Sequence, residues 1–235
     1  YCGGIRGTEL NYSMSSLNLI ALISKRLQEP LPGLESQIRM SPSKRFTRPD
    51  PPNTPIPAAV LILLFPDEDS WQFFLTERTH GVEYHQGQIS LPGGAREKDE
   101  SLAEAAIRET QEEIGISETP EIIGQLSQLH IPVSGFEVSP FVGWLPNRPE
   151  INPHDAEVAR VHEVTLAEFL APESQKWEER TFQKVEFDVP YFELDGVKVW
   201  GATAMMLSEF RQVLQKVLAE LKSGTEMLTL KKRIF

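Results

Sequence analysis

The chain has little cysteine, no surplus of positive charge and no long apolar run. Its one cysteine, Cys2, excludes an internal disulfide framework and fits a reducing compartment, so the cytoplasm is the expected location. A formal net charge of −11 argues against nucleic acid or an anionic membrane as the main partner. No apolar run reaches the length of a membrane span, and the N-terminus lacks the charged-then-apolar pattern of a signal peptide. Met14 fits a natural start, so residues 1–13 are read as an upstream extension or an added segment.

The length and composition fit one enzyme domain with a short arm. With 235 residues, 40% of them hydrophobic, the chain can bury a sizeable core. We expect an N-terminal helix and proline-rich arm over 1–57, the main domain over 58–223 and a tail over 224–235. Within the arm, Leu17–Leu27 has helical periodicity, and Pro30–Pro57 is expected to be irregular, with its basic side chains in solvent.

The most specific pattern in the chain lies between Gly94 and Ile116. Ser101 followed by Glu104 predicts a capping box, and Gly115 is placed to end a helix. The pattern is a glycine, five residues, a glutamate, seven residues, Arg-Glu, two residues, Glu-Glu, one residue, a glycine and an aliphatic residue, at Gly94, Glu100, Arg108, Glu109, Glu112, Glu113, Gly115 and Ile116.

Three acids of this helix share one face. Glu109, Glu112 and Glu113 stand at i, i+3 and i+4, where like charges repel, so a cation is needed to turn the cluster into a site. Hard divalent cations, above all Mg²⁺, suit oxygen ligands of this kind. The acids are expected to line a solvent-accessible groove, away from a core-facing stripe formed by Ala103, Ile107, Thr110 and Ile114.

Arg108 is interpreted as an orienting residue. It lies within one helical turn of Glu112 and can reach back toward Glu100, where a guanidinium can hold a carboxylate by paired hydrogen bonds. The ordinary alternative is a solvated, glutamate-rich helix with surface ion pairs. The fixed spacing of the whole pattern weighs against that alternative.

This segment resembles the signature box of the Nudix hydrolases at each glycine, arginine and glutamate of the family pattern. Thr110 departs from it, because that position is usually aliphatic. The resemblance implies an α/β fold, an α/β/α sandwich with a mixed β-sheet between helices, and hydrolysis of a diphosphate with Mg²⁺ or Mn²⁺ as cofactor. It also implies a metal site formed by Glu109, Glu112, Glu113 and the Gly94 carbonyl, because an acidic site holds a diphosphate only through bridging cations.

Motifs outside the box indicate a branch of the family. Phe74–Thr79 followed by Gly87–Gly94 resembles the upstream motif of the coenzyme A pyrophosphatases, and Ser134–Gly143 and Trp200–Ala204 are also similar to that branch. The similarity spans roughly Ala58–Phe210. It implies cleavage of coenzyme A or a derivative, a small nucleotide diphosphate, to 3′,5′-ADP and 4′-phosphopantetheine products.

Two residues depart from the branch motif. Glu83 stands where the motif has arginine, and Leu91 replaces phenylalanine. An acid in place of a base weakens recognition of an extra phosphate such as the 3′-phosphate of coenzyme A. A Nudix enzyme for ADP-ribose, dinucleotides or nucleotide sugars therefore stays an alternative. A non-catalytic nucleotide-binding module is a second one, which the intact acids argue against.

Further site residues are expected near the box. The candidates for substrate binding are Arg78, Gly93, Gly94 and His85. The two glycines permit close approach of a ligand because they have no Cβ. Glu157, in the loop before a predicted strand, resembles the glutamate that supplies a further metal ligand or a general base in many Nudix enzymes, the alternative being a solvated loop acid.

The remaining histidines and Trp200 are expected outside the site. His80, His130 and His162 are read as structural or exposed, and Trp200 as a core aromatic rather than an adenine platform. The sequence leaves open whether the protein forms a homodimer. Strands are expected over 58–65, 71–78, 121–131, 136–145 and 159–165, with a tight turn at Asp195-Gly196 inside 193–200 and a closing helix over 202–221.

Overall fold

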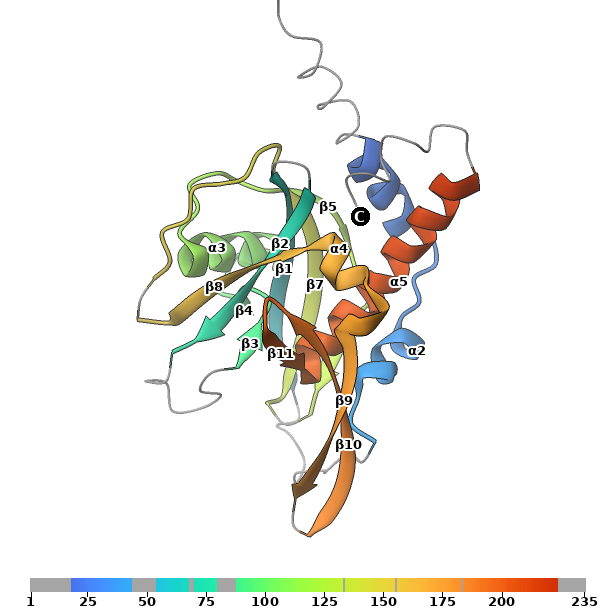
Figure 1. Ribbon diagram of the computed structural model, residues 1–235. Helices are drawn as coiled ribbons and strands as arrows, with labels where there is room; N and C mark the ends of the chain where they lie inside the picture. Colours follow the sequence, from blue (N-terminus) through green and yellow to red (C-terminus); the bar gives the residue numbers. More distant parts are fainter. Residues whose placement is uncertain are drawn as a thin grey trace, which may run out of the picture.

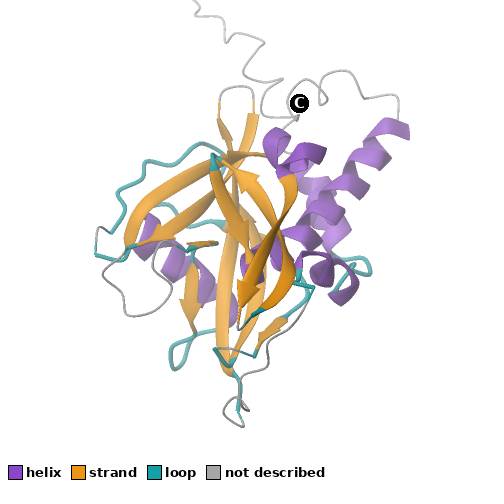
Figure 2. Ribbon diagram, turned by 60° about the horizontal axis from the view of Figure 1, so that its bottom comes forward, coloured by secondary structure: helices purple, strands orange, loops and turns teal. Residues whose placement is uncertain are grey.

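The computed structural model describes residues 18–43, 54–67, 70–79, 88–132, 134–154, 156–182 and 184–223. They form a mixed α/β fold in which a large sheet lies between helices, as expected from the sequence (Figures 1 and 2). One helix covers one face of the sheet, and the N- and C-terminal helices with a smaller sheet cover the other (Figure 1). The two faces therefore have separate cores.

The larger sheet has eight strands in the order β3-β2-β1-β7-β5, with β4 and β8 attached to β1 and β2, and β6 to β7. β1 and β7 are parallel and the other pairs are antiparallel, so the sheet is mixed, as predicted. The strands are β1 (Ile56–Asp67), β2 (Ser70–Arg78), β3 (Ile89–Ser90), β4 (Gly93–Ala95), β5 (Glu121–Gln125), β6 (Leu129–Ile131), β7 (Phe136–Trp144) and β8 (Val158–Thr165).

β1 is the central strand because both of its faces are apolar. Alternate side chains along a strand point to opposite faces, so an almost unbroken apolar run suits a strand covered on both sides. Leu61 and Leu63 pack in the core under α3 (Leu102–Ile114), whereas Ile62 and Leu64 pack in the core under α5 (Gly201–Ser223). All four side chains are fully buried.

The second sheet was only partly predicted. It has three strands, β9 (Gln175–Phe182), β10 (Val185–Leu194) and β11 (Val197–Trp200), in the order β11-β10-β9. The tight turn at Asp195-Gly196 joins β10 to β11 as expected, with Leu194 paired to Val197. The predicted strand 121–131 is wrong as one element, because the structure has β5 and β6 there with an interruption between them.

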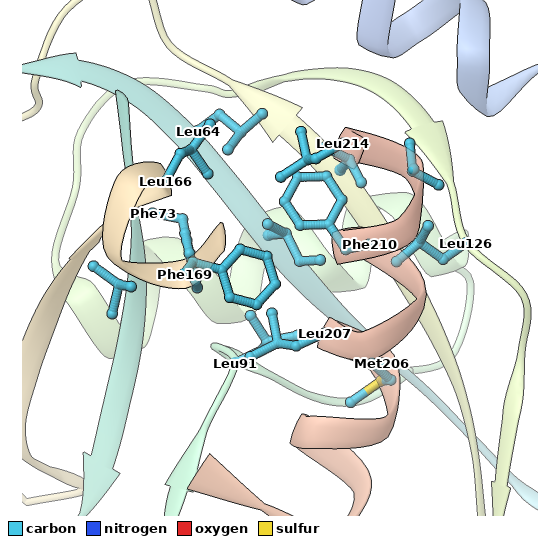
Figure 3. Packing of buried hydrophobic residues seen from close by; sticks show 14 of the residues in the cluster. Leu64, Phe73, Leu91, Leu126, Leu166, Phe169, Met206, Leu207, Phe210 and Leu214 are labelled. Atoms are coloured by element: carbon cyan, nitrogen blue, oxygen red, sulfur yellow. The ribbon is translucent and has the colours of Figure 1, made fainter. Parts of the chain in front are cut away.

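Aromatic packing joins the small sheet and its helices to the larger sheet. α4 (Leu166–Leu170) follows β8 directly and leads through a 3₁₀ turn, η2 (Pro172–Ser174), into β9. Figure 3 shows Phe169 of α4 between Phe73 of β2 and Phe210 of α5, with ring centroids 5.4 and 6.2 Å away. This cluster is the larger of the two cores.

The N-terminal region is part of that core. The predicted helix is present over residues 18–27, and its Leu19 and Ile23 are buried with α5. The prediction of an irregular arm is wrong for α2 (Leu34–Gln37) and η1 (Ile38–Met40), which form two short helical turns. A buried carboxylate on α5, Glu209, fixes them by accepting hydrogen bonds from the Gly33 N–H and from Gln37 Nε2, both at 3.0 Å. Among the described residues, no helix is long and apolar enough to cross a membrane.

Candidate active site

The helix of the signature segment begins and ends as its sequence predicts. The Ser101 hydroxyl accepts the Glu104 N–H at 3.2 Å, and the Glu104 carboxylate accepts the Ser101 N–H at 2.7 Å, which completes the capping box. Gly115 ends α3 in the left-handed conformation with φ of 73°. A Cβ at Gly115 would lie 1.8 Å from the Asn152 carbonyl oxygen, so this glycine also makes room for a passing loop. The ends of α3 are therefore fixed by local contacts and by the next loop.

The three acids of α3 differ strongly in exposure. Glu112 is 61% exposed, Glu109 is 19% exposed and Glu113 is only 7% exposed. The expectation that all three acids face solvent, away from the core stripe, is thus wrong for Glu113. Its neighbours on the helix, Thr110 and Ile114, are fully buried, and the Thr110 hydroxyl donates to the carbonyl one turn earlier at 2.7 Å.

Two of the acids lie against the Gly-Gly pair of β4. The Gly93 N–H donates to Glu113 Oε2 at 3.3 Å, and a Cβ at Gly94 would lie 2.6 Å from the Glu109 carboxylate. A Cβ at Gly93 would lie 2.3 Å from the Ala59 carbonyl oxygen of β1. The two glycines form a strand instead of an open turn, and their missing side chains make room for the Glu109 carboxylate and for β1.

Arg108 makes the two-point contact that its position predicts. Its Nε and Nη2 donate to the two oxygens of Glu100 at 3.1 and 2.8 Å. Its Nη1 donates to Glu109 at 2.9 Å and to Glu112 at 3.1 Å. Nη2 also donates to the Ala95 carbonyl at 3.3 Å, next to the glycine pair. One guanidinium thus joins the loop before α3, two acids of α3 and β4.

The electrostatic balance differs across the cluster. The hydrogen bonds from Arg108 lower the pKa of Glu100 to about 2, so Glu100 stays ionised. Burial raises the pKa of Glu113 to about 7, and the neighbouring Glu109 charge adds to the effect. Burial also raises the pKa of Glu109, although Arg108 opposes it. For Glu109 and Glu113, beside the glycine pair, the nearby positive charge therefore does not offset the effect of burial on the pKa.

Glu157 lies at the rim of this cluster. It directly precedes β8, as predicted, and is exposed. Its negative charge is close enough to contribute, after burial, to raising the pKa of both Glu109 and Glu113. Arg78, at the end of β2, acts on Glu113 in the opposite direction. The structure thus brings together the predicted acids, Arg78 and the glycine pair.

The remaining predictions have different outcomes. His85, Glu83 and Gly87 are outside the described residues. His162 is buried between the carboxylates of Asp195 and Glu77, at 2.7 and 3.4 Å, which fits the structural role predicted for it. Trp200 is not a core aromatic: it is 36% exposed, and the Arg180 guanidinium lies 4.5 Å from its ring centroid.

The contacts that hold the Glu157 loop were not predicted from the sequence. Thr79 donates hydrogen bonds to Ala156 and Glu157, which lie 77 and 78 positions later in the chain. The same loop is also hydrogen-bonded to the end of α3. The residue types involved, one threonine and backbone amides, carry no sequence signal of such a contact. The only local hint is the position of Gly115, whose close neighbour in the fold is Asn152.

The donor set fits a divalent cation, although the side chains are not arranged around one. Among the described residues, no three acidic, histidine or cysteine side chains converge closely enough to hold a metal ion. Arg108 holds Glu109 and Glu112 instead, and Glu113 faces the Gly93 N–H. Three neighbouring carboxylates, two of them against the glycine pair and with pKa values raised by desolvation, are the oxygen ligands that a hard cation prefers. Binding would require the side chains to turn, and the exposed Glu112 has room to do so.

Comparison with known proteins matches the sequence to a family. Residues 55–185, more than half of the chain, match the model of the NUDIX domain. The chain belongs to the Nudix family. The matched range contains Glu100, Glu109, Glu112, Glu113, Glu157 and both glycines of β4.

Curated relatives include further Nudix proteins. The chain is 32% identical over 143 residues to "Uncharacterized Nudix hydrolase NudL" of Photorhabdus laumondii, which covers 60% of this chain and 76% of that protein. It is 35% identical over 160 residues to "Nudix hydrolase 15, mitochondrial" of Arabidopsis thaliana, covering 64% of this chain and 55% of that protein. A MutT/nudix family protein from Enterococcus faecalis of known structure superposes with a TM-score of 0.47 at 15% identity, over 97% of this chain and 80% of that one. The family assignment rests on the sequence match.

Proposed function

We propose that this Nudix protein hydrolyses the diphosphate of coenzyme A or a coenzyme A derivative, giving 3′,5′-ADP and a 4′-phosphopantetheine product. The observation that carries the proposed diphosphate hydrolysis is the acid cluster of α3, with Glu109 and Glu113 against the Gly93-Gly94 pair. Glu109, Glu112 and Glu113, with the Gly94 carbonyl, would hold Mg²⁺ or Mn²⁺. When bound, the cation would neutralise diphosphate charge and activate water.

The protein's own residues would then position the reactants. Arg108 holds Glu100, Glu109 and Glu112 in one hydrogen-bonded set, so it orients the acids rather than contacting substrate. Glu157, exposed and close to Glu109 and Glu113, would accept a proton from water or serve as a further ligand. Arg78 would contact a phosphate of the substrate.

The choice of coenzyme A rests on the sequence motifs around the box, and Glu83 is the residue that counts against it. The second candidate is therefore a Nudix pyrophosphatase for ADP-ribose, dinucleotides or nucleotide sugars. The purified protein with Mg²⁺ should be incubated with coenzyme A, acyl-coenzyme A, NADH, ADP-ribose and nucleotide sugars, and the products identified by mass. Preferential formation of 3′,5′-ADP supports the proposal, whereas faster cleavage of ADP-ribose supports the second candidate.

The metal site is tested by Glu112→Gln and Glu113→Gln, each of which should lower turnover by orders of magnitude without loss of fold. In wild type, Mg²⁺ should raise the melting temperature, and the Glu113→Gln variant should lose most of that shift. Since the pKa of folded Glu113 lies above its ordinary value, the ionised side chain opposes folding near neutral pH, so the metal-free variant should be at least as stable as wild type.

Glu118→Gln, an exposed acid just beyond α3, is the matched control and should keep both turnover and the Mg²⁺ shift. Near-normal turnover of both site variants in Mg²⁺ would rule out the metal-site assignment. Loss of turnover in the control as well would show that the assay reports general charge, not the site.

Recognition of the 3′-phosphate can be tested with dephospho-coenzyme A, which keeps the diphosphate but lacks that phosphate. If Arg78 contacts the 3′-phosphate, wild type should prefer coenzyme A by about ten- to a hundredfold in kcat/KM, the effect of one charge-assisted hydrogen bond. Arg78→Ala should remove the preference. An equal loss with both substrates would place Arg78 on the diphosphate instead, and equal use of both by wild type would reject 3′-phosphate recognition.

A further inference from the structure

Thr79, the first residue after β2, is bonded to the loop that carries Glu157. Its backbone N–H donates to the Glu157 carbonyl at 3.0 Å, and its hydroxyl donates to the Ala156 carbonyl at 3.1 Å. Arg78, which acts electrostatically on Glu113, is the preceding residue. The end of β2 thus carries the positively charged Arg78, and the next residue, Thr79, holds the Glu157 loop.

The same loop is also bonded to the end of α3. The Asn152 N–H donates to the Ile114 carbonyl at 3.0 Å, and the His154 N–H donates to the Glu113 carbonyl at 3.2 Å. The His154 carbonyl in turn accepts the Glu157 N–H at 3.0 Å. The loop therefore bridges β2 and α3, the two elements that carry the charged groups of the site.

We propose that Thr79 is a positioning residue for hydrolysis, and that its hydroxyl holds the loop so that the Glu157 carboxylate stays close to Glu109 and Glu113. The inference rests on the role proposed above for Glu157. Ala156 and Glu157 are exposed, so packing does little to hold this part of the loop and its hydrogen bonds decide its place. Thr79 has no direct contact with the acids of α3 and acts through the loop.

The direct test is Thr79→Val, which keeps the shape and the backbone N–H but removes the hydroxyl. We expect kcat to fall about three- to tenfold with little change in KM, the effect of losing one hydrogen bond that orders a reacting group. Thr79→Ser should restore most of kcat. Thr165→Val is the matched control: its hydroxyl accepts the Glu168 N–H at 3.1 Å at the start of α4, so its loss should lower stability and leave kcat unchanged.

A double-mutant cycle separates this inference from the proposed function. If Thr79 acts through Glu157, adding Thr79→Val to Glu157→Gln should cause no further loss of kcat. An additive loss, or a wild-type kcat for Thr79→Val alone, would overturn the positioning role. A wild-type kcat for Glu157→Gln would overturn both it and the role of Glu157, while the metal-site test with Glu112→Gln and Glu113→Gln would still decide the hydrolase assignment.

Discussion

At the scale of single residues, Arg108 shows why arginine and lysine are not equivalent here. Its guanidinium makes a two-point contact with Glu100 and still has one nitrogen for Glu109 and Glu112. A lysine ammonium is a point charge on a flexible stem and cannot make this planar contact. The residue therefore acts by geometry as much as by charge.

Arg108→Lys should lower turnover although it keeps the charge, because the acids lose the group that fixes their relative positions. Arg148→Lys is a matched control, since Arg148 makes an equally two-pointed contact with Glu163 at 3.0 and 2.6 Å outside the cluster. Steady-state kinetics in Mg²⁺ should show a fall for the first variant alone. Wild-type turnover for Arg108→Lys would reduce the residue to a surface partner of Glu100.

At the scale of elements, Gly115 at the end of α3 is required for two reasons: its left-handed backbone conformation and the close approach of the Asn152 loop. Gly115 and Gly196 have nearly the same φ, 73° and 72°, but only Gly115 has a backbone oxygen, that of Asn152, where a Cβ would be. Alanine in this conformation costs about 1–2 kcal/mol by itself. Comparing alanine substitutions at Gly115 and Gly196 therefore separates the cost of backbone strain from the cost of a steric clash.

Gly115→Ala should lower the free energy of unfolding clearly more than Gly196→Ala, whose added Cβ meets no atom within 4 Å. The Gly115 variant should also lose activity, because relieving the clash moves the loop that carries Glu157. Urea unfolding and kcat measure the two effects. Equal costs for both variants, with activity kept, would mean that the loop simply shifts without consequence for the site.

The sequence predicted what depends on neighbours in the chain. The capping box, the αL glycine and the Arg108–Glu100 contact all follow from spacing within α3 and the residues before it. The burial of Glu113 could not be predicted in the same way, because it depends on β4 packing over the helix. Trp200 was misjudged for a similar reason: Val199 takes the core position, and a shift of one residue along a strand moves a side chain to the other face.

In the second sheet, β9 and most of β10 were not predicted, because β9 is rich in charged residues. β9 alternates charged residues that pair across strands, so its sequence resembles a solvated segment more than a strand. Lys198 of β11 bonds to Glu178 of β9, and Lys176 of β9 bonds to Glu193 of β10. Such pairs form only once the three strands have come together, which no local pattern indicates.

At the scale of the whole molecule, Glu209 ties the N-terminal region to the C-terminal helix. Besides the donors from α2 and its preceding glycine, the Ser127 hydroxyl donates to it at 2.7 Å. Its side chain is fully buried. A buried carboxylate is tolerated only when several donors satisfy it, and here the donors come from two distant parts of the chain.

Glu209→Gln should lower the free energy of unfolding by roughly 1.5–3 kcal/mol, because hydrogen bonds to a charged acceptor become neutral ones and an amide NH₂ group faces donors. Glu150→Gln, at an exposed position, should be neutral. Chemical denaturation measures both, and turnover per folded molecule should stay unchanged. An unchanged stability of Glu209→Gln would show that the N-terminal turns are held by apolar packing alone.

The acid cluster and the larger hydrophobic core lie on opposite faces of β1. The acid cluster belongs to the side of α3, while the larger core, with α5 and the N-terminal helix, lies on the opposite side of the same strand. Most substitutions in the larger core therefore lie across β1 from the acids, and the contact closest to the glycine pair is the Thr203 hydroxyl of α5, which donates to the Ile89 carbonyl of β3. A directed-evolution library confined to residues 207–221 of α5, beyond the Trp200–Ala204 motif, should therefore yield variants that differ in heat tolerance but share one substrate preference, whereas changes in specificity should arise from the opposite side.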